Sequence, residues 1–210
     1  MKTFKSFIKE QKEKEAFFTF GRMNPPTVGH GKLMDVLSSK SGNKPYYIYL
    51  SHSQDAKKNP LTYEQKIGHA RKMFPKHAKG IILDKKVKNV FDIANSLYSK
   101  GFEKVTMVVG QDRISEFETL LKKYNGVKAR HGFYDFKEIS IVSAGDRDPD
   151  AEGVEGMSAS KQRANVANND FDTFLKGVPS NMSRPNAKKL FDDLKKGMGV
   201  KSLIIINKII

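Results

Sequence analysis

Apolar and polar positions follow two different periods along this chain, and the two periods alternate. Five short apolar runs, rich in β-branched and aromatic residues, predict buried strands near residues 16–21, 46–51, 80–83, 104–109 and 138–143. Between them, apolar residues recur every three or four positions, which predicts helices near residues 29–39, 62–74, 90–99 and 113–124. This alternation predicts an α/β fold with a parallel sheet and right-handed crossovers.

Residues that favour the start or the stop of a helix stand at the expected boundaries. They are Asn89, the Thr62 and Gln65 pair of a capping box, Gly101, Gly126, and Ser183 and Gly197 at the two ends of a last helix.

The stretch at residues 21–30, Gly-Arg-Met-Asn-Pro-Pro-Thr-Val-Gly-His, is the most informative chemically. It joins the first expected strand to the first expected helix, so it lies at the carboxyl end of a strand, where open α/β sheets bind ligands. Such a turn gathers backbone N–H groups, a helix N-terminus and the imidazole of His30 around one small space, which suits a phosphate. The alternative is a turn rich in glycine and proline with an incidental histidine.

Residues 27–30, Thr-Val-Gly-His, are the threonine form of an (H/T)-x-G-H motif, and the chain here resembles the nucleotidylyltransferase superfamily. The resemblance implies a Rossmann-like, doubly wound parallel sheet of five strands in the order 3-2-1-4-5, with C-terminal helices after it. It implies catalytic roles for His30 and Thr27 at the phosphates. The nucleotide would also contact Gly21, Arg22, Met23 and Gly29.

A second stretch, at residues 51–62, follows the second expected strand and reads Ser-His-Ser-Gln-Asp-Ala-Lys-Lys-Asn-Pro-Leu-Thr. It resembles the segment after the second strand in archaeal-type nicotinamide-nucleotide adenylyltransferases, which carry S-x-Q and then N-P-F/L-T. The resemblance assigns Lys57, Lys58 and Asn59 to nucleotide binding. On the residues alone the stretch is a polar loop that leads into a capped helix, and both descriptions can hold together.

A third stretch, at residues 156–163, resembles the late I-S-S/G-T-x-x-R signature of the same superfamily. Ser158 and Ser160 would stand at a helix start and face an anion, and Arg163 would follow one turn later as a forked phosphate ligand with a catalytic role. An N-capped helix with no ligand is the alternative. Ala159, Ser160 and Gln162 depart from the usual residues of the signature, which puts the rate and the nucleotide preference in doubt.

A fourth signal is the Gly110-Gln111-Asp112 sequence after the fourth expected strand, with Asp112 expected to open a helix. It resembles the G-x-D of the superfamily, where the backbone passes close to the nucleotide. A strand that ends in glycine, with an aspartate near a helix N-terminus, explains the pattern equally well.

Composition narrows the class of protein. The 210 residues contain no cysteine, so disulfides and thiolate chemistry are excluded, and no apolar run is long enough to predict a membrane span. The net charge of +15 invites a polyanionic partner. Residues 55–88 hold ten Lys or Arg and three acids, which a funnel for triphosphates explains as well as DNA would. Because the lysines are scattered among acids, nucleic acid is not favoured.

The chain is expected to divide into a basic N-terminal arm at residues 1–15, a nucleotidylyltransferase domain at residues 16–177, and a C-terminal helix with an apolar tail at residues 178–210. Phe4, Phe7 and Ile8 give the arm helical apolar spacing. Residues 8–10, Ile-Lys-Glu, resemble the sites cut by prohead proteases of large tailed phages. The acidic loop at residues 146–155 is expected to be a surface loop, a lid or part of a Mg²⁺ environment. A cytoplasmic location, in a host cell or a virion if the chain is phage-encoded, is the expectation.

The implied chemistry is attack by an acceptor phosphate or hydroxyl on the α-phosphorus of a nucleoside triphosphate, with release of pyrophosphate and no protein nucleophile. Mg²⁺ would bridge phosphate oxygens, held mainly by the nucleotide and water. ATP and nicotinamide mononucleotide, as in NAD biosynthesis, are the leading substrates. The alternatives are a cytidylyltransferase acting on an alcohol phosphate and a catalytically silent nucleotide-binding or capsid-associated module. The sequence leaves open whether the chain forms a homo-oligomer.

Overall fold

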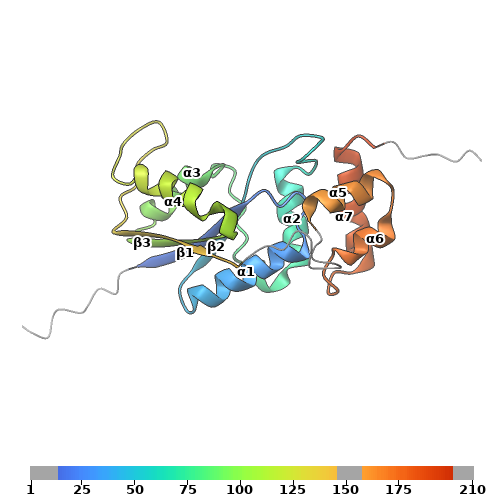
Figure 1. The fold of residues 1–210 in the computed structure, drawn as a ribbon, viewed down its shortest axis with the longest axis horizontal. Helices are drawn as coiled ribbons and strands as arrows, with labels where there is room; N and C mark the ends of the chain where they lie inside the picture. Colours follow the sequence, from blue (N-terminus) through green and yellow to red (C-terminus); the bar gives the residue numbers. More distant parts are fainter. Residues whose placement is uncertain (1–13, 146–157, 201–210) are drawn as a thin grey trace, which may run out of the picture.

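The computed structural model describes residues 14–145 and 158–200, and its centre is a four-stranded parallel sheet. The strands are β1 (Glu15–Gly21), β2 (Tyr46–Leu50), β3 (Lys104–Val109) and β4 (Glu138–Ser143), in the order β2-β1-β3-β4. The ends of β1 and β2 are in register, with Gly21 opposite Leu50. The carboxyl ends of the strands therefore meet at one edge, as the sequence predicts for the ligand site (Figure 1).

The expected strand at residues 80–83 is reduced to a single bridge between Ile81 and Ile48 beside β2. The backbone of Ile48 donates to Gly80 at 2.8 Å and accepts from Ile82 at 2.9 Å. Past Ile82 the chain leaves the sheet because the Tyr63 hydroxyl accepts from the Asp84 N–H at 2.9 Å. The sheet thus has four strands rather than five, but the segment holds the outer position that the predicted order gives it.

Helices cover both faces of the sheet, as a doubly wound fold requires. One apolar core cluster joins α1 (Val28–Ser41) and α2 (Tyr63–Met73) to residues such as Phe17. The other joins α3 (Val90–Ser99) and α4 (Ile114–Lys123) to residues such as Phe18. Phe17 and Phe18 lie in different cores because successive strand residues point to opposite faces.

The predicted helix starts at Thr62 and Asn89 are confirmed. The Thr62 hydroxyl accepts from the Gln65 N–H at 3.2 Å while the Gln65 side chain accepts from the Thr62 N–H at 2.9 Å. Asn89 caps α3 through the N–H groups of Phe91 and Asp92. Asp112 lies in a 3₁₀ turn, η3 (Gln111–Arg113), and α4 begins only after it; a similar short turn, η2 (Pro75–His77), follows α2.

Three helices at the C-terminal end pack together beside α2, at one end of the molecule in Figure 1. They are α5 (Ala159–Ala167), α6 (Phe171–Lys176) and α7 (Arg184–Gly197). His69 of α2 contacts the Asp193 carboxylate of α7 at 2.7 Å. Gly197 of α7 lies so close to the loop before α2 that a Cβ there would stand 2.0 Å from the Pro60 carbonyl oxygen. These contacts fix α7 against the segment that leads into α2.

Several expectations fall outside the described residues: the apolar spacing and the cleavage-site resemblance in the arm, the acidic loop at 146–155, and the apolar tail after residue 200. Among the helices that the structure describes, none is both long and apolar enough to cross a membrane.

Candidate active site

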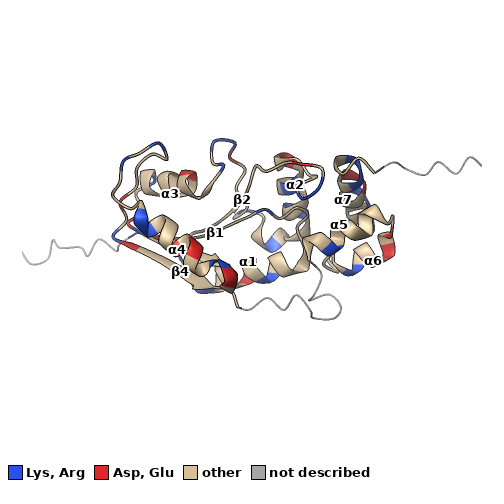
Figure 2. Cartoon of the chain, turned by 45° about the horizontal axis from the view of Figure 1, so that its top comes forward, with Lys and Arg blue, Asp and Glu red and all other residues tan. Residues whose placement is uncertain are grey.

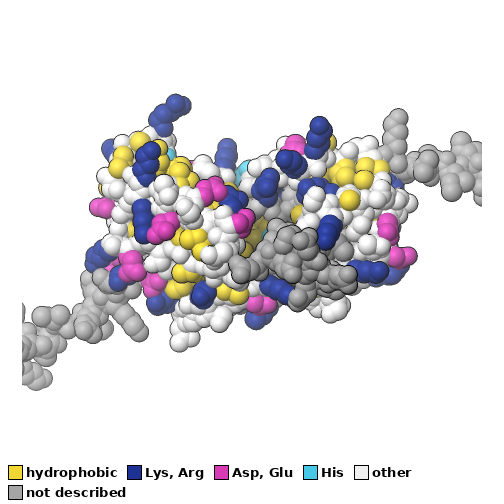
Figure 3. Space-filling model, in the orientation of Figure 1, with side chains coloured by type: hydrophobic (Ala, Val, Ile, Leu, Met, Phe, Trp, Pro, Cys, Tyr) yellow, Lys and Arg dark blue, Asp and Glu magenta, His cyan; other side chains and the backbone are white. Residues whose placement is uncertain are grey.

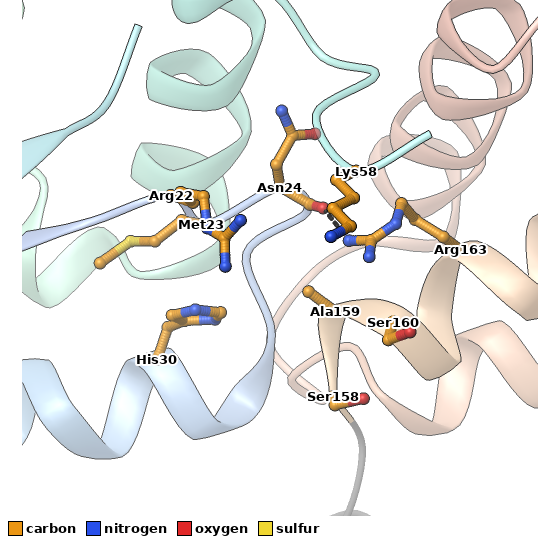
Figure 4. A pocket seen from close by; sticks show the side chains of 9 residues that line it. All are labelled: Arg22, Met23, Asn24, His30, Lys58, Ser158, Ala159, Ser160 and Arg163. Carbon is orange, nitrogen blue, oxygen red and sulfur yellow. Dashed lines mark hydrogen bonds between the residues drawn. The ribbon is translucent and has the colours of Figure 1, made fainter. Parts of the chain in front are cut away.

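A cavity of about 520 Å³ opens at the carboxyl edge of the sheet, and three separate stretches of the sequence meet around it (Figure 4). The loop after β1 and the first turn of α1 form one side, the loop after β2 forms another, and the first turns of α5 form the third. The lining residues are Arg22, Met23, Asn24, His30, Lys58, Ser158, Ala159, Ser160 and Arg163.

His30 is held by the residue that begins its own helix. The Thr27 backbone N–H donates to His30 Nδ1 at 3.0 Å, and the Thr27 hydroxyl oxygen lies 2.9 Å from the same nitrogen. A nitrogen that accepts an N–H bond carries no proton in the neutral imidazole, so the proton is on Nε2. The helix start therefore orients the ring and selects the tautomer that can donate from Nε2.

Thr27 itself is 2% exposed and does not line the cavity. The sequence predicts a hydroxyl that bonds a phosphate directly. The structure instead places that hydroxyl behind the imidazole, where it supports His30.

The cavity wall is strongly cationic. Arg22, Lys58 and Arg163 come from three different elements, and no carboxylate is among the lining residues within the ranges 14–145 and 158–200. Burial and the neighbouring Arg22 lower the pKa of Arg163, with Asp55 acting in the opposite sense. Arginine stays charged even so, because its ordinary pKa is far above 7. Three cations in one wall attract an anion that carries several charges.

Asp55 organises the loop that presents Lys58. One carboxylate oxygen accepts the N–H groups of Lys57 and Lys58 at 2.9 and 2.7 Å, and the other accepts from the Asn59 amide at 2.5 Å. These bonds lower the pKa of Asp55 to about 2. Asn59 is thus buried within the loop and Lys57 is exposed outside the cavity, which leaves Lys58 as the lysine of this loop that lines it.

The first turn of α5 lines the cavity with Ala159 between two serines. Ser158 is the N-cap, and its side-chain oxygen accepts from the Lys161 N–H at 3.1 Å. Figure 4 shows Ala159 directed toward the cavity, with the Ser158 and Ser160 hydroxyls turned away from His30. Gln162, which departs from the apolar residue usual at its position, is fully buried and donates to the Phe174 carbonyl at 2.9 Å, so it joins α5 to α6.

The sequence predicts a set of residues that contact the nucleotide or act in catalysis. Seven of them line the cavity, and an eighth supports a lining residue. Arg22, Met23, His30, Lys58, Ser158, Ser160 and Arg163 line it, and Thr27 supports His30. The other predicted residues do not line it: Gly21, Gly29, Lys57, Asn59, Gly110 and Asp112. Asn24 also lines the cavity, and the sequence does not predict this. The burial of its side chain becomes apparent only in the folded chain.

Residues 18–207 match the family described as cytidylyltransferase-like. The chain belongs to this family. It has the Rossmann-like α/β fold that the superfamily resemblance implies. No curated protein matches the chain.

Two solved structures share the fold of this cytidylyltransferase-like chain. One is a bifunctional NMN adenylyltransferase/ADP ribose pyrophosphatase from Francisella tularensis, at 13% identity and a TM-score of 0.54, over 90% of this chain and 51% of that one. The other is the Plasmodium falciparum nicotinic acid mononucleotide adenylyltransferase complexed with NaAD, at 14% identity and a TM-score of 0.51, over 88% of this chain and 97% of that one. The chain spans about half the length of the Francisella enzyme.

The cytidylyltransferase-like chain offers no metal site of its own in the residues described. No group of three His, Cys, Asp or Glu side chains there could hold a metal ion, and the lining residues supply no carboxylate. Since Mg²⁺ prefers carboxylate, phosphate and water oxygens, these cavity residues do not fit a metal bound by the protein alone.

Proposed function

We propose that this nucleotidyltransferase transfers a nucleoside monophosphate, best matched by AMP from ATP, to a small phosphorylated acceptor, with nicotinamide mononucleotide as the leading candidate. The observation that carries the proposal is the cavity with three cations and one oriented imidazole. The resemblance of residues 51–62 to nicotinamide-nucleotide enzymes supports this acceptor. So do two solved structures of similar fold, an enzyme with NMN adenylyltransferase activity and a nicotinic acid mononucleotide adenylyltransferase.

In this proposal an oxygen of the acceptor phosphate attacks the α-phosphorus, and the bond from that phosphorus to the α,β-bridging oxygen breaks. Pyrophosphate leaves with the electron pair, so no protein nucleophile is required. The Nε2–H of His30 donates to an α-phosphate oxygen as negative charge builds there. Arg163 and Lys58 bind the β- and γ-phosphates, and Arg22 adds charge on the His30 side of the cavity.

A phosphate acceptor fits the cavity better than an alcohol does. An alcohol has to lose a proton as it attacks, which calls for a general base. Among the lining residues that the structure describes, His30 is the one group that could serve, and Thr27 holds it in the donor tautomer. A phosphate monoester is already an anion near neutral pH, so it needs no base.

Magnesium enters the proposal only as a partner of the nucleotide. Mg²⁺ would arrive bound to the triphosphate and water, where it neutralises charge on the phosphate oxygens. The residues of the cavity would then bind the phosphates and not the ion.

Two other functions remain to be tested against this one. A cytidylyltransferase acting on an alcohol phosphate would use the same cations, and the family match favours it as the second candidate. A silent nucleotide-binding module is disfavoured because His30 is oriented as a donor, a feature that binding alone does not require.

The test is a screen of ATP, CTP, GTP and UTP against phosphorylated acceptors, including nicotinamide mononucleotide and glycerol phosphate, with pyrophosphate as the readout. We expect release with ATP and nicotinamide mononucleotide, and its loss in His30→Ala. Release with CTP and an alcohol phosphate would select the cytidylyltransferase. Absence of release with every pair, together with binding of a triphosphate, would select the silent module.

A further inference from the structure

Asn24 occupies the centre of the candidate site, yet its side chain is aimed at the protein and not at the cavity. The residue is 2% exposed, although its backbone belongs to the cavity wall. Its amide nitrogen donates to the Leu61 carbonyl at 3.2 Å, and its amide oxygen accepts from the Leu61 N–H at 3.0 Å. The side chain thus pairs with both polar backbone groups of one residue, as a neighbouring strand would.

Leu61 is fully buried and ends the short loop that carries Lys58, just before α2 begins. Two hydrogen bonds to its backbone therefore fix the height of that loop above the loop after β1. Both bonds are buried, so breaking them would leave the N–H and the C=O of Leu61 unpaired. This cost in free energy disfavours movement of the loop.

The backbone of Asn24 holds the third wall of the cavity. Its carbonyl accepts from Arg163 Nη1 at 2.7 Å, a bond drawn as a dashed line in Figure 4. One residue therefore joins the loop after β1 to the loop of Lys58 through its side chain and to α5 through its carbonyl. Lys58 and Arg163, two of the cations that line the cavity, come from these two elements.

We infer that Asn24 is a positioning residue that sets the distance between Lys58 and Arg163, and so matches the site to a chain of phosphates. This inference rests on the proposed function, because the two cations act on phosphate only if the cavity binds one. Asn24 touches no substrate atom in this role; it acts through the two cations.

The chain contains a matched control at the other end of the sheet. Asn125, in the connection between α4 and β4, donates to the Phe136 carbonyl at 2.9 Å and accepts from the Phe136 N–H at 2.9 Å. Asn125→Ala therefore removes the same pattern of bonds as Asn24→Ala, from a partly buried side chain that does not line the cavity. A loss that comes only from reduced stability should appear in both variants.

The experiment is a double-mutant cycle on the full chain, with inorganic tripolyphosphate as a probe that does not depend on the base. Calorimetry measures its dissociation constant at a temperature where every variant is folded. We expect Asn24→Ala to raise the dissociation constant about tenfold in the wild-type background and less than about twofold in the Lys58→Ala background, because positioning is lost once the positioned group is gone. Asn125→Ala should leave the constant unchanged. If Asn24→Ala fails to fold, Asn24→Ser carries the same cycle.

Equal effects of the Asn24 substitution in the two backgrounds would overturn the positioning role while leaving the proposed function intact. Unchanged affinity in both Lys58→Ala and Arg163→Ala would overturn the proposed function and this inference together. An Asn125→Ala variant that weakens binding as much as Asn24→Ala would show a general loss of stability and would also overturn the role.

Discussion

At the scale of single residues, the site depends on how side chains bond to nearby backbone. Thr27 and His30 repeat, at the start of α1, the arrangement that Thr62 and Gln65 form at the start of α2. In both, the third helical residue accepts the N–H of the capping residue. The difference is chemical: the residue in that position is an imidazole in α1 and an amide in α2. In the proposed function, the imidazole of this helix start also donates to a phosphate.

This comparison gives a prediction with its own control. His30→Ala should lower kcat by about 10²–10³, since one preorganised donor is lost. It should also destabilise the protein by about 1 kcal/mol, because the buried Thr27 N–H loses its acceptor. His30→Gln recreates the capping box found at Thr62, so it should keep the wild-type Tm and still lose kcat. Single-turnover rates and thermal unfolding measure the two effects; wild-type turnover in a folded His30→Gln protein would exclude the imidazole from the reaction.

Lys66 is a buried charge that bonds the backbone of the loop after β2. Its side chain is fully buried, its ammonium donates to the Ser51 carbonyl and, at 3.4 Å, to that of Ser53, and burial lowers its pKa to about 8. No carboxylate pairs with it among the hydrogen bonds and ion pairs of the described residues, so the folded state disfavours its charged form.

Alkaline pH should therefore stabilise the protein through Lys66. Between pH 8 and about 10.5 the unfolded chain keeps a proton on Lys66 that the folded chain has lost, so the free energy of unfolding rises with pH in this window. In Lys66→Met this rise should disappear. Urea unfolding of both proteins at several pH values measures the difference; parallel curves would show that the ammonium of Lys66 is not perturbed by folding.

At the scale of elements, α5 shows how a helix can be recognised in sequence while its contacts are not. The capping serine and the arginine one turn later predict the helix and the cation. They do not predict that Ala159 faces the cavity or that Gln162 joins α5 to α6, because both depend on how α6 packs. Arg163 also serves two partners, a phosphate in the proposed function and the Asn24 carbonyl in this structure.

Arg163→Ala should raise the KM for the nucleoside triphosphate and slow pyrophosphate release, since it removes a forked cation from the leaving group. Arg163→Lys should recover only part of the loss, because an ammonium cannot reach the Asn24 carbonyl and a phosphate with the same planar geometry. Steady-state kinetics of the two variants provide the measurement. Wild-type kinetics in Arg163→Ala would show that α5 is a capped surface helix with no part in nucleotide binding or catalysis.

The sequence predicts most elements because their signals are local. Apolar periods and caps give all four strands of the sheet, the helices α1 to α4, and α7. The strand predicted at residues 80–83 is wrong as a full strand. The hydroxyl of Tyr63, which is distant in sequence, bonds the Asp84 N–H at the point where the chain leaves the sheet. The short helix α6 was missed, since six residues give too little periodicity and its Asp170 cap is ambiguous in sequence. For the site, motifs predict the cations and His30, whereas Asn24 could not be predicted because its role is tertiary.

At the scale of the whole molecule, charged side chains are dispersed over the surface, whereas the candidate site brings three cations together. Figure 2 shows Lys and Arg spread over loops and helices, with Asp and Glu among them. On the face drawn in Figure 3, basic side chains are scattered rather than joined in one stripe. The net charge of +15 therefore attracts anions to the molecule in general. The three cations of the cavity concentrate this attraction at one site.

A ligand that binds the folded cavity and not the unfolded chain must raise the Tm. At about 100 times its dissociation constant, ATP with Mg²⁺ should raise the Tm by roughly 5–10 °C for a protein of this size. The shift should shrink in Arg163→Ala and should fall as salt screens the cations. Thermal unfolding with each of the four nucleoside triphosphates at millimolar concentration tests this, and no shift with any of them would remove the basis for a nucleotide site.

The close approach of Gly197 to Pro60 bears on how the cavity can open. The backbone of the last helix touches the loop of Lys58 where even a methyl group would collide with a carbonyl oxygen. That contact joins the end of α7 directly to the loop of Lys58, so a displacement of one requires a displacement of the other. A wider cavity mouth would therefore need α7 and this loop to move together, and it would also break the bonds that Asn24 makes to Leu61 and Arg163.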